Sequence, residues 1–514
     1  MGFSYDTCAI HPATKNLQCA YSHPQVVEEY LRIEVTTSRV AGPFCQSAIS
    51  GVHISRFGVI PKSHQPNKWR LIVDLSHPKH HSINDGVPSS LCSIHYITIE
   101  DAVQKIMALG PGTMMAKIDI KSAFRLIPVH PTDRHLLGMR WKDYTFVDTC
   151  LPFGLRSAPK LFNVLADLLT SVLTRQGVTF VLHYLDDFLT LGPPASNICQ
   201  QNLNIIQKVC GSLGIPLALE KIEGPATILT FLGITLDTTN MEARLPKDKI
   251  NRIRQLITSW LGKKKATKRE ILSLVGLLQH ATKVIRCGRT FVSRMYSAAA
   301  RIKELDHFTR LNKEFRSDLW WWHTFMENWN GLSLLRLKAS EIAPNIYIQT
   351  DASGSWGCGA YFNGRWFQLQ WSSDWLPSSI MAKEMVPIML SCATWGPNLS
   401  KKSFCFQCDN SSIVVALQKG SAKEQTVMHL LRCLWFFVAY YDIHLVATHI
   451  PGIANSTADC LSRCNMQSFF TLNPQASPDP TPLPPSLLQI ISIPGPDWTS
   501  PLFHQLFTTT INKD

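Results

Sequence analysis

The sequence contains no long hydrophobic run, although apolar residues make up 45% of its 514 residues. Its most apolar stretch, CLWFFVAYY, extends only from Cys433 to Tyr441, whereas a membrane span needs about 20 apolar residues. The first residues, MGFSYDTCAI, lack the basic and apolar regions of a signal peptide. Asp6 also breaks the myristoylation pattern. We therefore expect no membrane partner.

Acidic residues are fewer than basic ones. Lys and Arg number 50 and Asp and Glu 37, which gives a net charge of +13. This excess favours a polyanionic partner, either nucleic acid or an anionic membrane surface. The 15 cysteines are odd in number and scattered, a pattern typical of free thiols in a reducing compartment. We expect an intracellular protein, cytoplasmic or nuclear.

Several familiar motifs are also absent. The sequence has no D-[ST]-G motif of aspartic proteases, no zinc-knuckle spacing and no recognisable integrase. Cys405 and Cys408 form a C-x-x-C pair, but an odd offset on an expected strand points the side chains to opposite faces, which disfavours zinc binding. For the histidine-rich run HPKHH (77–81), a loop that faces nucleic acid is a better interpretation than a metal site.

Between about 56 and 240, short β-type runs such as RLIVDL (70–75) and MMAKIDI (114–120) alternate with helical patterns, which predicts an α+β domain. Residues 245–300 predict a helical hairpin with a basic tip, GKKKATKR (262–269). The tip is a solvated loop, a nuclear localisation signal or a contact for a nucleic-acid backbone.

A second α/β region is predicted at about 344–465. It begins with three strands, NIYIQTDAS, GCGAYFNG and RWFQLQW, and continues with the helix IMAKEMVPIMLSCATW. A further strand, two helices, the strand HLVATHI and a final helix near NSTADCLSR follow. The proline-rich segment 467–514 is expected to be a linker or disordered.

Asp186 and Asp187 lie side by side in the apolar run VLHYLDDFLTLG. We expect them at a hairpin turn, but a turn explains one Asp and not two. Adjacent carboxylates repel each other unless a cation such as Mg²⁺ neutralises them. Asp119, at the end of KIDI, is a candidate third ligand on a neighbouring strand, although alone it could be a surface or capping residue.

These segments resemble a reverse transcriptase palm. KIDIKSAF resembles its first catalytic motif, YLDD its Y-x-D-D box, and LPFGLRSAPKLF (151–162) the motif that lines the nucleotide pocket. KWRLIVDL (68–75) resembles the fingers strand that grips the triphosphate, and LALEKIEGPATILTFLG (217–233) the closing palm motifs. Five motifs in this order across one segment make a specific signal.

The resemblance implies a role for each matching residue. Asp119 and Asp186, assisted by Asp187, would hold two Mg²⁺ ions, with Mn²⁺ possible, that activate the primer 3′-hydroxyl and stabilise the leaving pyrophosphate. The other matching residues are expected to bind the nucleotide. Lys62 and Arg70 would contact phosphates, Phe124 would exclude a ribose 2′-hydroxyl, Phe153 and Gly154 would line the pocket, and Lys221 would protonate pyrophosphate.

Four further acids mark the second region, namely Asp351, Glu384, Asp409 and Asp459. Singly, each has an ordinary interpretation as a strand-end residue or a helix cap. Together, their order and settings resemble ribonuclease H, which implies that they hold two Mg²⁺ ions for attack on an RNA phosphodiester. One departure is that Ile453 stands where retroviral relatives carry a mobile histidine. His449 is expected to end the preceding strand and is given no role.

The expected fold class is α+β, a right-hand polymerase followed by a ribonuclease H-like α/β domain. The expected parts are an N-terminal extension (1–55), fingers (56–115), palm with part of the fingers (116–242), helical thumb (243–300), connection (301–343), ribonuclease H-like domain (344–466) and tail (467–514).

The sequences VEEYLRIEVTTSRVAGPF (27–44) and VDLSHPKHHSINDGVP (73–88) are most similar to those of DIRS-like retrotransposons. Such elements usually continue into a tyrosine recombinase, and PDWTSPLFHQLF (496–507) resembles the linker before it.

The predicted function is RNA-directed DNA synthesis with fused ribonuclease H. The expected partners are an RNA template, a DNA primer, an RNA–DNA hybrid and deoxynucleoside triphosphates, whereas the oligomeric state is unknown. Two alternatives remain open: a decayed or domesticated nucleic-acid-binding protein, and a chain in which only the nuclease is active.

Overall fold

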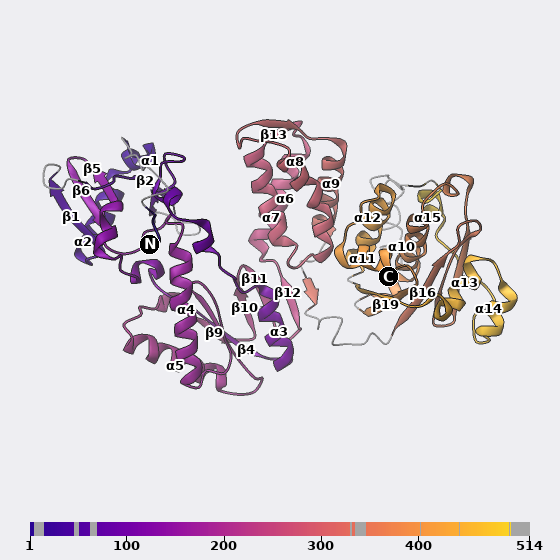
Figure 1. Ribbon diagram of the computed structural model, residues 1–514. Coiled ribbons are helices and arrows are strands. Elements are labelled where there is room, and N and C mark those ends of the chain that lie inside the picture. The colour runs from indigo at the N-terminus through magenta and orange to yellow at the C-terminus, as the bar shows by residue number, and fades with distance from the viewer. Residues whose placement is uncertain are drawn as a thin grey trace. The chain divides into compact units, whose positions relative to one another are not determined.

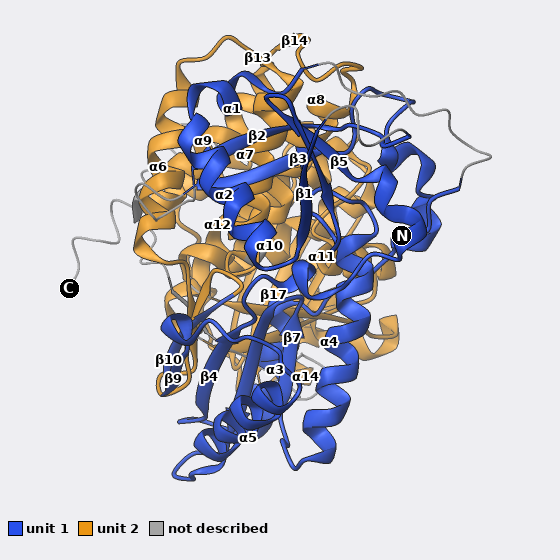
Figure 2. Ribbon diagram, turned by 90° about the vertical axis from the view of Figure 1, so that its left-hand side faces the viewer, with its two compact units in different colours: residues 1–231 blue, residues 232–514 orange. Residues whose placement is uncertain are grey.

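A computed structural model describes most of the chain. The described residues are 1–4, 15–45, 51–61, 69–328, 332–334, 346–400, 402–441, 443–492 and 494. The chain divides into two units, Met1–Phe231 and Leu232–Asp514, shown in different colours in Figure 2. None of the helices in the described ranges is long and apolar enough to cross a membrane.

The first unit is built around a four-stranded sheet, here called the central sheet, with the order β7-β8-β4-β9 (Figure 1). Its strands are β4 (Met114–Asp119), β7 (Val181–Tyr184), β8 (Asp187–Gly192) and β9 (Glu223–Ala226). Helices α4 (Ala158–Arg175) and α5 (Ile198–Ser212) pack on it. Inward-facing residues such as Ala116, Ile118 and Phe188 join Phe162 of α4 in one buried core. Burial of this apolar face is what fixes the strand register.

A second core in the first unit joins segments from the N-terminus to the strands expected in the fingers. Its elements are α1 (Gln18–Ser22), α2 (Pro24–Thr36), β1 (Val40–Cys45), β2 (Arg56–Pro61), β3 (Trp69–Asp74), β5 (Gly138–Trp141) and β6 (Tyr144–Asp148). Strands pair in the order β1-β6-β5 and, separately, β2-β3. Residues 15–45, whose sequence gives no clear pattern, therefore belong to this folded core. The remaining helix of the unit is α3 (Ile99–Leu109).

The second unit begins with short strands and a group of helices. These elements are β11 (Ile234–Asp237), β12 (Glu242–Arg244), α6 (Lys247–Leu261), β13 (Lys265–Thr267), α7 (Lys268–Ala281), α8 (Ser293–Ala300), β14 (Phe308–Arg310), α9 (Lys313–Asn328) and β15 (Leu332–Leu334). Helices α6 and α7 form the predicted hairpin. Its basic tip includes β13, which pairs with β14, and the Lys265 ammonium lies 5.0 Å from the Phe308 ring centroid.

The rest of the second unit, here called the C-terminal sheet domain, contains a five-stranded sheet with the order β18-β17-β16-β19-β20. Its strands are β16 (Tyr347–Ala352), β17 (Gly357–Phe362), β18 (Arg365–Gln370), β19 (Ser403–Cys408) and β20 (His444–His449). Strand β17 pairs antiparallel with both β16 and β18, whereas β19 and β20 run parallel to β16. The helices are α10 (Ile380–Leu399), α11 (Ser411–Lys419), α12 (Gln425–Tyr440), α13 (Ser456–Ser462), α14 (Met466–Leu472) and α15 (Pro485–Ile490).

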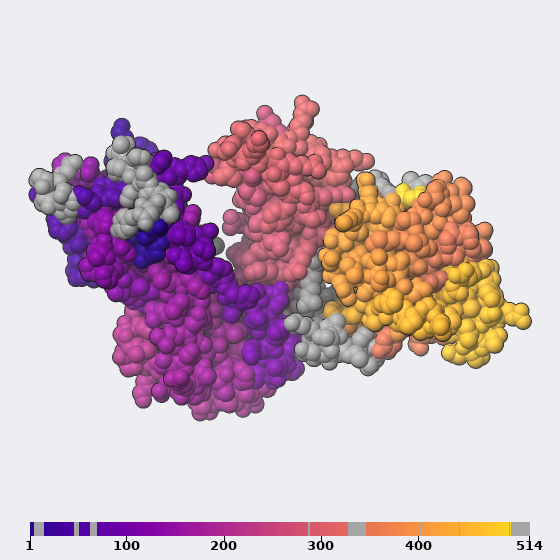
Figure 3. All heavy atoms as spheres, viewed as in Figure 1, coloured from indigo at the N-terminus to yellow at the C-terminus, as the bar shows by residue number. Residues whose placement is uncertain are grey.

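The segment after α13 differs from the linker expected from its prolines. Through residue 492 it packs on the C-terminal sheet domain, and Figure 3 shows its yellow atoms lying against the orange atoms of that domain. The Trp366 indole donates to the Ser477 carbonyl at 2.7 Å, and Leu487 is fully buried. Pro474 follows the end of α14 and Pro485 opens α15, so prolines bound short helices within a packed segment. Most of the recombinase-linker resemblance (496–507) lies outside the described residues.

Candidate active sites

The first acidic cluster, Asp119, Asp186 and Asp187, lies at one end of the central sheet. Strand β4 ends at Asp119, which pairs directly with Asp187 at the start of β8. Asp186 belongs to the two-residue turn between β7 and β8, where Leu185 has a φ of 53°. This left-handed conformation is unfavourable for Leu but is the one that two-residue hairpin turns require. The structure therefore brings together three acids that the sequence separates, and it places the pair at a hairpin turn as predicted.

Crowding and burial change the acidity of this cluster. Burial, together with the charges of Asp187 and Asp119, raises the pKa of Asp186 to about 6. The pKa of Asp187 is raised by burial and by Asp119. Both shifts have the sign expected of carboxylates that share one partly dehydrated site. A bound cation would relieve this repulsion.

Lys221 contacts the first acidic cluster. Its ammonium lies 3.0 Å from each carboxylate oxygen of Asp119. The segment before it is tied to the end of β4, because the Ala218 amide donates to the Asp119 carbonyl at 2.9 Å. The Lys221 side chain is 49% exposed, so it can leave this carboxylate without disturbing a core.

The expected nucleotide-binding residues surround a row of aromatic rings. The Arg70 guanidinium of β3 lies 5.4 Å from the Phe153 ring centroid. Phe153 meets the Phe124 ring edge-on at a centroid distance of 5.4 Å, and Phe124 meets buried Phe162 at 5.8 Å. The structure thus brings together Arg70, Phe124 and Phe153. Lys62 lies outside the described residues.

Gly154 has a structural reason to be glycine. Its φ is +100°, and an added Cβ would collide with the Val73 carbonyl oxygen of β3. Asn84 holds this loop in place, since its amide donates to the Gly154 carbonyl at 2.9 Å and its side-chain oxygen accepts from the Arg156 amide at 2.8 Å. Sequence reasoning missed Asn84, because a lone Asn in a loop carries no distinctive signal.

The second acidic cluster comprises Asp351, Glu384, Asp409 and Asp459. Asp351 lies in β16, Glu384 in α10, Asp409 directly after β19 and Asp459 in α13. Single ligand atoms of Glu384, Cys408 and Asp409 lie within 4.8 Å of one another. Asp351 is close enough to Asp409 and Asp459 for their charges to shift its pKa. The structure therefore brings together acids from four separate segments of the chain.

Burial is deeper in this second cluster. It raises the pKa of Asp351 to about 6 and that of Glu384 to about 9, and in each case neighbouring acids add to the effect. Glu384 is only 4% exposed. Because burial also raises the pKa of the Cys408 thiol, that sulfur stays protonated, and it donates to Glu384 at 3.8 Å. The available ligands are thus carboxylate oxygens.

Two residues that sequence reasoning did not single out position Asp351. The buried Ser462 hydroxyl donates to one of its carboxylate oxygens, and the Asn455 amide donates to the other at 3.4 Å. Both belong to the N-x-x-x-D-x-L-S-R pattern, so the pattern held a signal for them. His449 ends β20 as expected, and its imidazole contacts the Asp409 carbonyl at 3.1 Å.

Both clusters fit a hard divalent cation. Each gathers carboxylates from elements far apart in the sequence, and in each the carboxylates raise one another's pKa. Oxygen-rich groups of this kind are the ligands that Mg²⁺ prefers, with Mn²⁺ an accepted substitute. Acids that repel one another in a partly buried site are stabilised by a cation bound between them.

Comparisons with known proteins agree with this geometry. Residues 60–236 match the family model described as reverse transcriptase (RNA-dependent DNA polymerase). The chain is 23% identical over 384 residues to the Transposon Tf2-3 and Tf2-4 polyproteins of Schizosaccharomyces pombe, and each match covers 71% of this chain. It spans only about a quarter, 26%, of the length of these relatives.

A solved structure of the foamy viral protease-reverse transcriptase dRH in complex with ds DNA is similar in fold. Its TM-score is 0.51 at 16% identity, and the match covers 87% of this chain and 73% of that one. The α+β fold class predicted from the sequence, with the fold of a reverse transcriptase, is confirmed, whereas the ribonuclease H-like assignment of the C-terminal sheet domain stays a prediction. Residues 60–236 therefore match the reverse transcriptase family, in a chain that is similar to part of a retrotransposon polyprotein.

Proposed function

We propose that this chain is an RNA-directed DNA polymerase with a fused ribonuclease H, which copies retroelement RNA into DNA. One observation carries the proposal: Asp119 pairs with Asp187 beside the Asp186 turn, inside the segment that matches the reverse transcriptase family. The substrates would be an RNA template, a DNA primer and deoxynucleoside triphosphates. The basic excess of the chain suits these polyanions.

In the polymerase, each part of the pocket has a distinct task. Asp119, Asp186 and Asp187 would hold the divalent ions. These ions, when bound, lower the pKa of the primer 3′-hydroxyl and neutralise charge on the leaving pyrophosphate. Arg70 is exposed beside Phe153 and can reach a triphosphate with its planar guanidinium. Lys62 is proposed to assist it.

The other nucleotide contacts would come from the aromatic row. Phe124 would bar a ribose 2′-hydroxyl, while Phe153 and Gly154 line the pocket. The Lys221 ammonium donates to the Asp119 carboxylate in this structure. It would release that carboxylate when a divalent ion binds, and it would then protonate the departing pyrophosphate. Because the Lys221 side chain is exposed, this movement requires little free energy.

The nuclease proposal depends on the C-terminal sheet domain. Its strand order and the convergence of Asp351, Glu384, Asp409 and Asp459 support hydrolysis of the RNA strand of an RNA–DNA hybrid. Divalent ions, when bound, activate a water for attack on the phosphodiester. Ser462 and Asn455 would keep Asp351 in place for binding them.

We assign the element to the DIRS-like class on the sequence resemblances at 27–44 and 73–88. A genomic sequence in which this frame continues into a tyrosine recombinase would support this assignment, and an integrase of the long-terminal-repeat type would overturn it. We also infer a reducing compartment, cytoplasmic or nuclear, because the described cysteines are free thiols.

Primer extension on an RNA template with Mg²⁺ tests the polymerase. The wild type is expected to extend the primer and Asp186→Ala to lose the activity. Asp143→Ala is a matched control, because Asp143 occupies the same place in the two-residue turn between β5 and β6, and the preceding Lys142 has a φ of 54°. An inactive wild type, or an active Asp186→Ala variant, would refute the assignment.

Cleavage of a labelled RNA–DNA hybrid tests the nuclease. Asp409→Asn is expected to abolish cleavage and leave extension intact, whereas Asp374→Asn, at an exposed acid of the same domain, should change neither. Cleavage without extension would support the nuclease-only alternative. Salt-sensitive binding without either activity would support a domesticated nucleic-acid-binding protein.

A further inference from the structure

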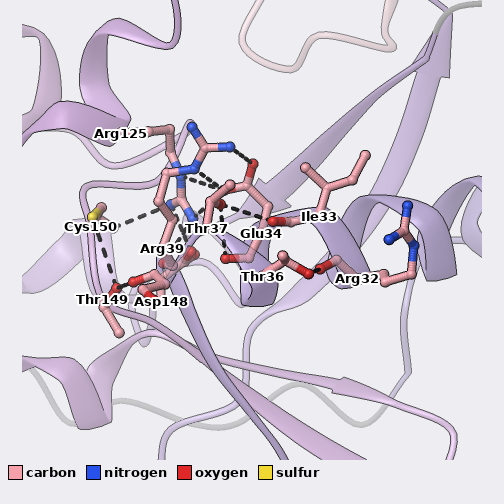
Figure 4. Close-up of polar contacts among 11 residues, drawn as sticks. Arg32, Ile33, Glu34, Thr36, Thr37, Arg39, Arg125, Asp148, Thr149 and Cys150 are labelled. Atoms are coloured by element: carbon pink, nitrogen blue, oxygen red, sulfur yellow. Dashed lines mark hydrogen bonds and ion pairs between the residues drawn. The ribbon is translucent and has the colours of Figure 1, made fainter. Parts of the chain in front are cut away.

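A buried group of charges lies directly beside the proposed sugar-selecting ring. We call Arg125, Glu34, Arg39 and Asp148 the Arg125 network; Figure 4 shows these side chains converging from separate segments. Arg125 belongs to the short 3-10 helix Ala123–Leu126, Glu34 to α2 and Asp148 to β6. Arg125, Glu34 and Asp148 are 5%, 6% and 3% exposed.

Every N–H donor of the Arg125 guanidinium has an acceptor. Its Nε and Nη2 bond to Glu34 at 3.1 and 2.9 Å, and its Nη1 bonds to Asp148 at 2.6 Å. The remaining N–H groups reach the carbonyls of Arg39 at 3.0 Å and Cys150 at 3.3 Å. Five N–H donors in a fixed plane are thus all used. Lysine, with three donors on one nitrogen, cannot reproduce this arrangement.

The network is also balanced in charge. Arg39 bonds to both oxygens of Glu34, at 2.7 and 3.0 Å, so two guanidinium groups face two carboxylates. Burial raises the pKa of Asp148 to about 6, while the Arg125 charge opposes that rise. Removing one member would leave a buried charge without its partner, which is strongly destabilising.

Stability alone is a weak reason for such a network, because a buried ion group contributes little more than well-packed apolar residues. Its position suggests another reason. Phe124 immediately precedes Arg125, and the turn that carries both begins at Ser122, whose φ is 58°. Arg125 fastens that turn to α2, β6 and the loop before β1, so a shift of Arg125 would move the Phe124 ring against Phe153.

We propose that Arg125, held by Glu34 and Asp148, is a positioning residue that fixes the Phe124 ring and thereby sets the discrimination between deoxyribonucleotides and ribonucleotides. This proposal rests on the proposed polymerase function. It gives residues 24–45, which the sequence leaves without a role, a part in substrate choice through Glu34 and Arg39. Neither residue would touch the nucleotide.

The test compares kcat/KM for a deoxynucleoside triphosphate with that for the matching ribonucleotide, on one primer and RNA template. Phe124→Ala, which removes the ring proposed to exclude a ribose 2′-hydroxyl, is the reference variant. Arg125→Met and Arg125→Lys are expected to lower the discrimination ratio by about tenfold, mostly through better use of the ribonucleotide. Glu34→Gln, the mildest variant and the one most certain to fold, is expected to lower it about threefold.

Two controls separate positioning from general damage. Arg432→Met removes an equally buried guanidinium from Asp318, 3.2 Å away in the second unit, so it should reduce stability without changing the ratio. In a Phe124→Ala background, Arg125→Met should reduce the ratio no further, because the ring that it positions is gone. Such non-additivity is expected only for residues that act as one unit.

The outcomes distinguish the two proposals. If the wild type does not extend primers, the polymerase assignment fails and the positioning proposal falls with it. If the wild type extends, Phe124→Ala loses discrimination, and both Arg125→Lys and Glu34→Gln keep the wild-type ratio, only the positioning proposal is overturned. Additive losses in the double variant would likewise overturn it.

Discussion

The two acidic clusters solve the same electrostatic problem in different ways. In the first, the carboxylates are partly exposed and a mobile cation of the chain, Lys221, lies on Asp119. In the second, Asp351 and Glu384 are nearly fully buried, and hydroxyl, amide and thiol donors contact them, while Arg463 lies on the more exposed Asp459.

The difference shows in the acidity of each cluster. The pKa of Asp186 reaches about 6, whereas that of Glu384 reaches about 9. At neutral pH Asp186 is therefore mostly ionised, while Glu384 retains its proton. A divalent ion held by Glu384 would displace its proton, whereas one held by Asp119 would displace Lys221. Four predictions test this contrast.

The largest effects are expected within the first cluster, where the acids should not be equivalent. Asp119→Asn removes a ligand at the end of β4 and should slow primer extension by about a thousandfold, since metal contacts contribute several kcal/mol to such reactions. Asp187→Asn should slow it by only about ten- to a hundredfold, because its proposed role is to assist. Extension rates at saturating Mg²⁺ measure both. Equal losses would remove the assisting role of Asp187.

The second prediction concerns stability without metal. The pKa of Glu384 rises from an ordinary 4.5 to about 9 on folding, so the folded state binds its proton more tightly. Stability is then lost as the pH rises from about 4.5 to about 9. Glu384→Gln should remove this loss, raising the melting temperature in EDTA by several degrees at pH 8 and by almost nothing at pH 4.

The matching variant in the first cluster sharpens the contrast. The stabilisation of its unit by Asp186→Asn should grow only between about pH 4 and 6 and stay constant above pH 6, at a smaller value than for Glu384→Gln, because the pKa shift of Asp186 is smaller. Glu314→Gln, at an exposed acid in the second unit, is the control and should have no effect. A pH-independent gain for Glu384→Gln would show that Glu384 is ionised in the folded protein.

Much of this arrangement can be predicted from the sequence, because strand ends carry a local signal. Asp119 and Asp409 each follow an apolar run, and neighbouring strands of a sheet bring such ends together. The Asp186 turn is predictable for the same reason. What the sequence could not supply is the set of partners that lie far away along the chain, such as Ser462 for Asp351 or Glu34 for Arg125.

Two segments were harder to interpret for a different reason. Residues 24–45 contain one amphipathic helix and one strand. The fold of neither could be assigned from its own sequence, because their apolar side chains pack against β2, β5 and β6. The segment after α13 is rich in proline, which suggests a linker, yet Phe469 and Leu487 are fully buried. Composition reports the average tendency of a segment, whereas these side chains are buried by a surface formed elsewhere in the chain.

The third prediction concerns the cations next to each cluster. Lys221→Met should lower the Mg²⁺ concentration for half-maximal extension by about two- to fivefold, because the competing ammonium is gone. The rate at saturating Mg²⁺ should also fall if Lys221 protonates pyrophosphate. Arg463→Met is the counterpart at Asp459, and its effect on hybrid cleavage should be smaller because both side chains are more exposed. A larger effect of Arg463→Met on hybrid cleavage than of Lys221→Met on primer extension would contradict this prediction.

The smallest effect is expected at His449. Its imidazole contacts a backbone carbonyl, not a carboxylate, so His449→Ala should leave hybrid cleavage within about twofold of the wild type. Ile453 is 94% exposed in the short helix Gly452–Asn455, and a Cβ on Gly452 would lie 3.4 Å from an Asp409 carboxylate oxygen. A titratable ring at position 453 is therefore placed to assist departure of the product.

Ile453→His should accordingly raise the multiple-turnover rate of hybrid cleavage by about two- to threefold and leave the single-turnover rate unchanged, as expected where product release limits turnover. Ile453→Gln is the control, because it adds polarity without a group that titrates near neutral pH. A loss of single-turnover cleavage in His449→Ala would instead assign the histidine function to the end of β20. The second cluster would then use a protonatable side chain from its own strand, and its contrast with the lysine-bearing first cluster would narrow.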